Sequence, residues 1–393
     1  MLTRNAFDPQ CLTIFQMNLI FNIRIFWRRL TIWTILYLVS GYKGIGTSEE
    51  AFSNIYLEFL DFGNMLEIIF GRESTAEYTA FSNTYAFLWR DLITAQLEGD
   101  TEAVQQYVNR LYQTVNEGAA FLASINPFMD EAVLRSLFGT YLLYTIEQAN
   151  SIMTGEYNIA ITDRLTELTN RLGDYFAESV YEYITSGFRY VPQPGDVRQC
   201  ISYEQMNEIY SIRMFWFELI LWIRAYMLSL HLGIGKTDEV YNRLRQVPLD
   251  YVNSLKGFFG EHPAEDDLLR ELYTYIDLIG TLFTAQKAGN MDEIDRITRL
   301  LYKNADERAA SISSLNPAWN EEEWRSRLYR HIRYTIAGSS SLLAGDYARN
   351  LDIFRSLMNL ADSASGYFAK GLLQYLFTAG KMNTRQPESL VSS

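Results

Sequence analysis

The feature that most constrains the fold of this chain is a long internal repeat. The phrase "PQCLTIFQMN" at 9–18 returns as "RQCISYEQMN" at 198–207, and "FNIRIFWRRLTIW" at 21–33 returns as "YSIRMFWFELILW" at 210–222. Further matching pairs are "SINPFMDEAVLRSLFGTYLLYTI" (124–146) with "SLNPAWNEEEWRSRLYRHIRYTI" (314–336), and "DYFAESV" (174–180) with "GYFAKGL" (366–372). Because the offset stays close to about 190 residues, the pattern predicts a tandem duplication of a whole domain rather than a short-period solenoid.

The repeat divides the chain near its middle. A chain of 393 residues suits two domains better than one core. The segment "GFRYVPQPGDVRQ" contains two prolines and two glycines, which favour a linker over a helix. The predicted organisation is a first bundle at 9–187, a linker at 188–199, a second bundle at 200–378 and a flexible tail at 379–393.

Each half is predicted to be helical throughout. Strand alternation is absent, and the prolines inside the repeats fall at the starts of elements or in loops. Thr13 with Gln16, and Ser202 with Gln205, have the spacing of a capping box at the start of a helix. Long helices with short connections pack as antiparallel neighbours, so the fold class is all-α, with roughly five to six helices in a bundle per half.

The first predicted helix has almost no polar face. A helix that is apolar all round is normally surrounded by protein, so we expect this helix and its copy to be central to their bundles. The two copies either pack on each other as a pseudo-dimer or serve as core helices of independent domains. Arg24, Arg28 and Arg29 interrupt the apolar run, so no transmembrane segment is predicted.

Charge and cysteine content exclude some classes of function. The formal net charge is −13, whereas phosphate binding requires a basic surface, so nucleic acid is not an expected partner. Two cysteines are too few for a disulfide framework, and the apolar start is not a clean export signal. The default expectation for location is therefore the cytoplasm.

The pattern "QCLT…IR.FW…W", then "NP…E.WRS.LY.H…T", "GDY" and "YFA.G", resembles a family of small helical proteins of spore-forming Gram-positive bacteria. Members are commonly labelled "acetylglutamate kinase". The resemblance covers each half nearly end to end, so it implies two family domains in tandem, and it makes the spore or cell surface an alternative location. A kinase needs a glycine-rich phosphate loop after a strand, and "GIGTSEE" (44–50) and "GIGKTDE" (233–239) follow no predicted strand. No enzymatic activity is therefore expected.

The resemblance also implies a set of inward polar positions. Family members place a histidine in the middle of three helices and an aspartate on the last, a set that suits a metal or ligand site in a bundle core. The matching positions are Leu30, Tyr85, Tyr141 and Asp174 in the first half, and Leu219, Tyr275, His331 and Gly366 in the second. Neither half keeps the set, so no metal and no cofactor are expected.

His331 is the one histidine of that set, and it lies on a predicted inward stripe. It is either a general base or lone ligand, or a core histidine hydrogen-bonded to a neighbour, and the second interpretation is preferred.

Arg24 and Arg213 occupy equivalent places in apolar surroundings, where an unpaired charge costs several kcal/mol. Each is predicted to form a structural ion pair, with the floor of a pocket as the alternative. The candidate partners in the first half are Asp174, Glu178 and Glu147.

Cys11 and Cys200 precede the first helix of each half. The helix dipole favours a reactive thiolate there, and a disulfide between the two copies is also conceivable. The preferred interpretation is two free, half-buried thiols.

Two functions remain after these exclusions. The chain has 27 tyrosines and seven tryptophans, and tyrosine is enriched at protein interfaces. The first hypothesis is a non-enzymatic structural or assembly protein that contacts itself or another protein through aromatic-rich helical surfaces. The alternative is a bundle that binds a small molecule or metal in its core.

Overall fold

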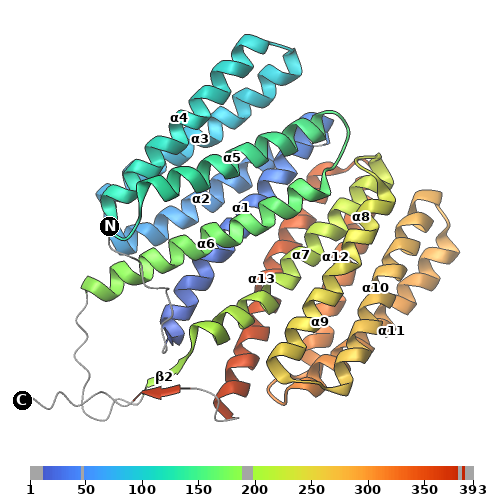
Figure 1. Ribbon diagram of the computed structural model, residues 1–393. Coiled ribbons are helices and arrows are strands. Elements are labelled where there is room, and N and C mark those ends of the chain that lie inside the picture. The colour runs from blue at the N-terminus through green and yellow to red at the C-terminus, as the bar shows by residue number, and fades with distance from the viewer. Residues whose placement is uncertain (1–11, 46–47, 188–197, 379–382, 386–393) are drawn as a thin grey trace, which may run out of the picture. The chain divides into compact units, whose positions relative to one another are not determined.

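The computed structural model describes residues 12–45, 48–187, 198–378 and 383–385, and these form helices joined by short turns, with three short strands (Figure 1). The all-α prediction is therefore confirmed. The chain forms two compact units that divide between Gln193 and Pro194, inside the predicted linker. We call 15–193 the N-terminal unit, and 194–393 together with 1–14 the C-terminal unit.

Six helices form the N-terminal unit. Contacts join α2 to α3, α3 to α4, α4 to α5 and α5 to α6, as short connections require. The helices are α1 (Ile14–Lys43), α2 (Ser48–Phe70), α3 (Arg72–Glu98), α4 (Thr101–Ile125), α5 (Glu131–Met153) and α6 (Ile159–Gly187).

In the C-terminal unit the first helix, α7, contacts α8, α9, α10, α12 and α13. The helices are α7 (Tyr203–Leu232), α8 (Thr237–Leu244), α9 (Gln246–Phe259), α10 (Pro263–Ala288), α11 (Met291–Leu315), α12 (Glu321–Leu343) and α13 (Tyr347–Thr378). The order matches that of the N-terminal unit, with α8 and α9 in the place of α2. The duplication itself stays a prediction.

Local capping explains where several helices begin. The side chain of Ser202 accepts a hydrogen bond from the backbone of Gln205, whose own side chain accepts from Ser202, so the predicted capping box is present. Asp100 and Asn290 cap α4 and α11 at matching positions.

The repeated Asn-Pro phrase forms a turn whose asparagine side chain is hydrogen-bonded to the last helix of each unit. The side-chain amide of Asn126 donates to the carbonyl of Ser179 at 3.1 Å, and that of Asn316 donates to the carbonyl of Gly371 at 2.9 Å. Both asparagine oxygens also accept a backbone N–H two residues on, at 3.0 Å. These motifs therefore serve the packing of α6 and α13.

α1 and α7 are core helices, as their apolar sequences predict. Apolar residues on every side of both helices are buried, among them Trp33 and Trp222. By length and composition α7 alone among the described helices is apolar enough to cross a membrane, and 78% of that apolar segment is buried inside the structure. That degree of burial is typical of a core helix. The packing of α1 against α7 stays a prediction.

A small antiparallel sheet corrects the predicted domain limits. Strand β1 (Leu12–Thr13), expected in the first bundle, pairs with β2 (Arg198–Ile201) and belongs to the C-terminal unit. Leu12 lies opposite Ile201, its equivalent in the repeated phrase. Strand β3 (Asn383–Arg385) pairs with β2 on its other side, so the prediction of a flexible tail is wrong for these residues. Strands this short have no periodicity to reveal them in sequence.

Cys200 lies on β2, where it is buried and disulfide-bonded. The preferred interpretation of free thiols is therefore wrong for Cys200. Cys11, the only other cysteine of the chain, lies outside the described residues.

Candidate functional site

The inward positions of the N-terminal unit surround an aromatic cavity of about 40 Å³. Tyr85 and Tyr141 both line it, and the hydroxyl of Tyr141 lies 3.0 Å from Oγ1 of Thr31. Burial raises the pKa of both tyrosines, so they are neutral hydroxyls. The lining residues are Trp27, Leu30, Phe59, Phe81, Tyr85, Val115, Phe138 and Tyr141.

The matching positions of the C-terminal unit hold a polar pair. Nε2 of His331 lies 2.7 Å from the hydroxyl of Tyr275, and His331 is only 3% exposed. Burial, with the nearby charge of Arg308, lowers the pKa of His331 to about 3. Burial also raises the pKa of Tyr275 to about 12. His331 is thus a neutral core histidine bonded to a neighbour, which is the interpretation preferred from sequence.

Arg308 on α11 belongs to the same cluster and was not identified from sequence. It is 2% exposed, and its guanidinium carbon lies 4.2 Å from the centre of the Tyr275 ring. Nε and Nη2 have no hydrogen-bond acceptor, and burial lowers the pKa of Arg308 to about 10. Glu271, whose pKa burial raises, accepts a bond from Ser311 at 2.9 Å and leaves Oε2 unbonded. The cluster therefore buries unsatisfied donors and acceptors together.

The corresponding place in the N-terminal unit is filled by a ring. Phe81 and Gly118 stand at the positions of Glu271 and Arg308 in the repeat. A Cβ on Gly118 would lie 2.3 Å from the Phe81 ring, so the ring occupies the space next to that backbone. An alignment of the two halves would have indicated Arg308, because a glycine in the first copy, Gly118, corresponds to a long cationic residue in the second.

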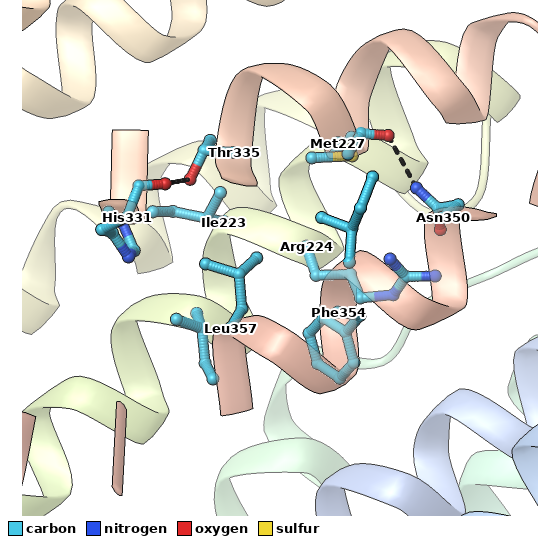
Figure 2. Close-up of a pocket in the computed structure, with 11 residues that line it drawn as sticks. Ile223, Arg224, Met227, His331, Thr335, Asn350, Phe354 and Leu357 are labelled. Atoms are coloured by element: carbon cyan, nitrogen blue, oxygen red, sulfur yellow. Dashed lines mark hydrogen bonds between the residues drawn. The ribbon is translucent and has the colours of Figure 1, made fainter. Parts of the chain in front are cut away.

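A second buried arginine lines a small pocket formed by α7, α12 and α13 (Figure 2). The pocket has a volume of about 10 Å³, which is space for about one water molecule. Arg224 is 9% exposed, and its guanidinium carbon lies 4.7 Å from the centre of the Phe354 ring. Within the described chain no carboxylate forms an ion pair with Arg224, and burial lowers its pKa to about 10. His331 lines the same pocket.

Arg24 and Arg213 form ion pairs in their own units. Nε of Arg24 lies 2.7 Å from Oδ1 of Asp174, and burial of that carboxyl raises its pKa despite the arginine. Nη2 of Arg213 lies 3.6 Å from Oδ1 of Asp362. Asp362 is one helical turn before Gly366, the position that corresponds to Asp174. The ion-pair interpretation agrees with both contacts, although sequence did not identify Asp362.

The groups that the site offers are enclosed cations and neutral hydroxyls. Among the described residues, no three histidine, cysteine or acidic side chains gather as a group that could hold a metal ion. His331 is neutral and enclosed, and Cys200 is oxidised, so neither is poised as a nucleophile or base. Arg308 and Arg224 instead offer unused donors to an acceptor.

Comparison with known proteins adds no relative: no protein family, curated protein or solved structure matches this chain.

Proposed function

We propose that this protein is a non-enzymatic assembly protein that associates with a second copy of itself through the exposed face of α2. The observation that carries the proposal is an apolar stripe on that face. Leu57 and Leu60 lie on it, with 48% and 42% of each residue exposed, and Tyr56 adjoins them. Ile68 lies on the same face at 87% exposure, beyond the exposed residues Asp61 and Asn64. Apolar side chains that gather on one exposed face mark protein contact sites more often than scattered ones do.

The corresponding surface of the C-terminal unit is different. The exposed positions of α9 are mostly polar, namely Gln246, Asp250 and Asn253, and they include one large apolar side chain, Leu249, at 36% exposure. A general need for solubility or folding would act on both units alike, so the stripe of α2 favours a specific contact. A second copy is the simplest occupant because a two-fold axis places the same surface patch of each copy against the other, so that one apolar stripe would cover its equivalent.

The interiors of the two units support a role without shared chemistry. The packing framework recurs, with the Asn-Pro turns and the arginine ion pairs in both units. The enclosed polar positions do not recur, since Tyr141 stands where the other unit has His331. Most tyrosines are buried or partly buried, so the aromatic surplus stabilises the cores and the interface rests on aliphatic side chains.

Light scattering on the purified full-length chain tests the proposal. The wild type is expected to give the mass of a dimer, and L57E with L60E is expected to give the mass of a monomer, because charge in an apolar contact is strongly unfavourable. Asn253→Glu on α9 is the matched control and should leave the dimer intact. A wild type that stays monomeric at high concentration would refute the proposal.

A second candidate function is a bundle that binds a small molecule in the C-terminal unit. It is favoured by the two unbonded nitrogens of Arg308 and by Arg224, because a buried cation that lacks an acceptor is costly unless a ligand supplies one.

A further inference from the structure

The aromatic cavity of the N-terminal unit is a space that the packing of its core does not fill. Its volume is about 40 Å³, whereas a single water molecule needs roughly 10–15 Å³. Protein interiors are otherwise close-packed, with few voids larger than one water molecule. The cavity therefore has room for a guest of about two or three heavy atoms.

Rings that contact one another form much of the cavity wall. The ring centre of Tyr85 lies 6.2 Å from that of Phe59 and 6.5 Å from that of Phe81. The ring centres of Trp27 and Phe138 are 5.9 Å apart. A ring packed against its neighbour has little freedom to turn into the open space, so the lining does not collapse over it.

The chemistry of the wall suits an apolar guest. Six rings, a leucine and a valine form it, and no charged side chain takes part. The hydroxyl of Tyr141 already shares a hydrogen bond with Oγ1 of Thr31, at 3.0 Å. A buried water molecule usually makes about three hydrogen bonds, which walls built mainly of carbon do not supply, whereas apolar cavities stay dry and take up benzene or xenon.

Two lining residues on α3 give the cavity a route to solvent. Phe81 and Tyr85 are half-buried, whereas the other six lining residues are buried. Partly exposed side chains change rotamer rapidly, so a brief movement of these two rings admits a small guest while the helices stay folded.

In the C-terminal unit a side chain covers the ring that matches Tyr85. This ring is Tyr275, and the guanidinium carbon of Arg308 lies 4.2 Å from its centre. The N-terminal unit has Gly118 in place of Arg308, so no side chain extends from α4 at this position. The cavity is therefore a property of the N-terminal unit and not a requirement of the shared helix order.

We propose that the aromatic cavity between α1, α2, α3, α4 and α5 is a binding site for one small apolar molecule of about two or three heavy atoms, such as a short hydrocarbon. The proposal is independent of the assembly function, because the site lies inside one unit and uses none of the exposed residues of the stripe on α2.

Thermal unfolding of the full-length chain under xenon, compared with helium at the same pressure, tests the site. Xenon is expected to raise the Tm of the wild type in a saturable way, because a guest that binds only the folded state stabilises it. Val115→Ile adds a methyl group at the cavity wall, and the xenon affinity should fall by at least about tenfold because the remaining space is too small. Val180→Ile is the matched control: Val180 is buried on α6, which contributes no lining residue, so the xenon response should persist.

The proposal is overturned if the Tm of the wild type rises no more under xenon than under helium. It is also overturned if Val115→Ile leaves the xenon response unchanged, or if Val180→Ile abolishes it as well. If Val115→Ile does not fold, crystals of the wild type pressurised with xenon decide the question. A xenon peak between Tyr85 and Val115 supports the site, and a peak only elsewhere, or no peak, overturns it.

Discussion

The hydroxyl of Tyr275 lies 2.7 Å from Nε2 of His331 in the core of the C-terminal unit, and both side chains are almost fully buried. The same two places in the N-terminal unit hold Tyr85 and Tyr141, which line an aromatic cavity. One scaffold thus accepts a histidine or a phenol at the same depth, because each has a hydrogen-bonded neighbour that satisfies its polar atom.

The low pKa of His331 predicts a loss of stability in mild acid. The folded-state pKa is about 3 and the unfolded value is 6.5, so below pH 6.5 the unfolded chain binds a proton that the folded chain does not. Stability should therefore fall as the pH falls from 6.5 toward 3, by about 2 kcal/mol at pH 5. His331→Gln should remove this contribution. Urea unfolding of both proteins across the range measures it, and an identical pH dependence would contradict the assignment, since all other titrating groups are shared.

A close helix contact predicts the effect of one methyl group in α13. A Cβ at Gly371 would lie 1.8 Å from Nε1 of Trp319, so Gly371→Ala must displace a buried indole. We expect a loss of about 1–3 kcal/mol, as for other overpacked cores. Gly366→Ala on the same helix is the control: its Cβ meets nothing within 4 Å, so it should stabilise by roughly 0.5–1 kcal/mol. Chemical denaturation of both variants decides the matter, and equal effects would rule out the contact.

The ion pair of Arg213 with Asp362 lies one helical turn from the place of the Arg24–Asp174 pair, and this shift predicts that a second substitution restores lost stability. Asp362→Asn removes the carboxylate that faces Arg213, and we expect the Tm of the C-terminal unit to fall by a few degrees. Adding Gly366→Asp restores an aspartate at the place that Asp174 occupies opposite Arg24, so part of the loss should be recovered. Calorimetry on the single and double variants measures this. A double variant no more stable than Asp362→Asn alone would show that an aspartate at position 366 does not replace the one at position 362.

The exchange of Phe81 and Gly118 for a glutamate and an arginine in the other unit predicts strong coupling. Gly118→Arg alone should destabilise the N-terminal unit severely, because the Phe81 ring lies where the new side chain must start. Phe81→Glu frees that space and supplies the acid that the C-terminal unit has as Glu271. A double-mutant cycle should therefore give a favourable coupling of about 1–3 kcal/mol. Additive effects would contradict the equivalence of the two places.

The starts of several helices could be predicted from the sequence by itself, because they depend on capping and turn residues close to each other in the chain. The capping pair Ser202 and Gln205 marked the start of α7, and the Asn-Pro phrases marked the turns before α5 and α12. The all-round apolar first helices indicated burial, and α1 and α7 are buried. These features depend on residues within a few positions of each other, so periodicity and capping rules reach them.

Pairing across the chain was decided only by the tertiary structure. Asp362 rather than Gly366 faces Arg213, β1 joins the C-terminal unit, and Arg224 and Arg308 are enclosed without an acidic partner within ion-pair distance in the described residues. A capping residue acts on its own helix, whereas a buried charge depends on which helix packs over it. Spacing in one chain does not encode that neighbour, and one turn of helix is enough to change it.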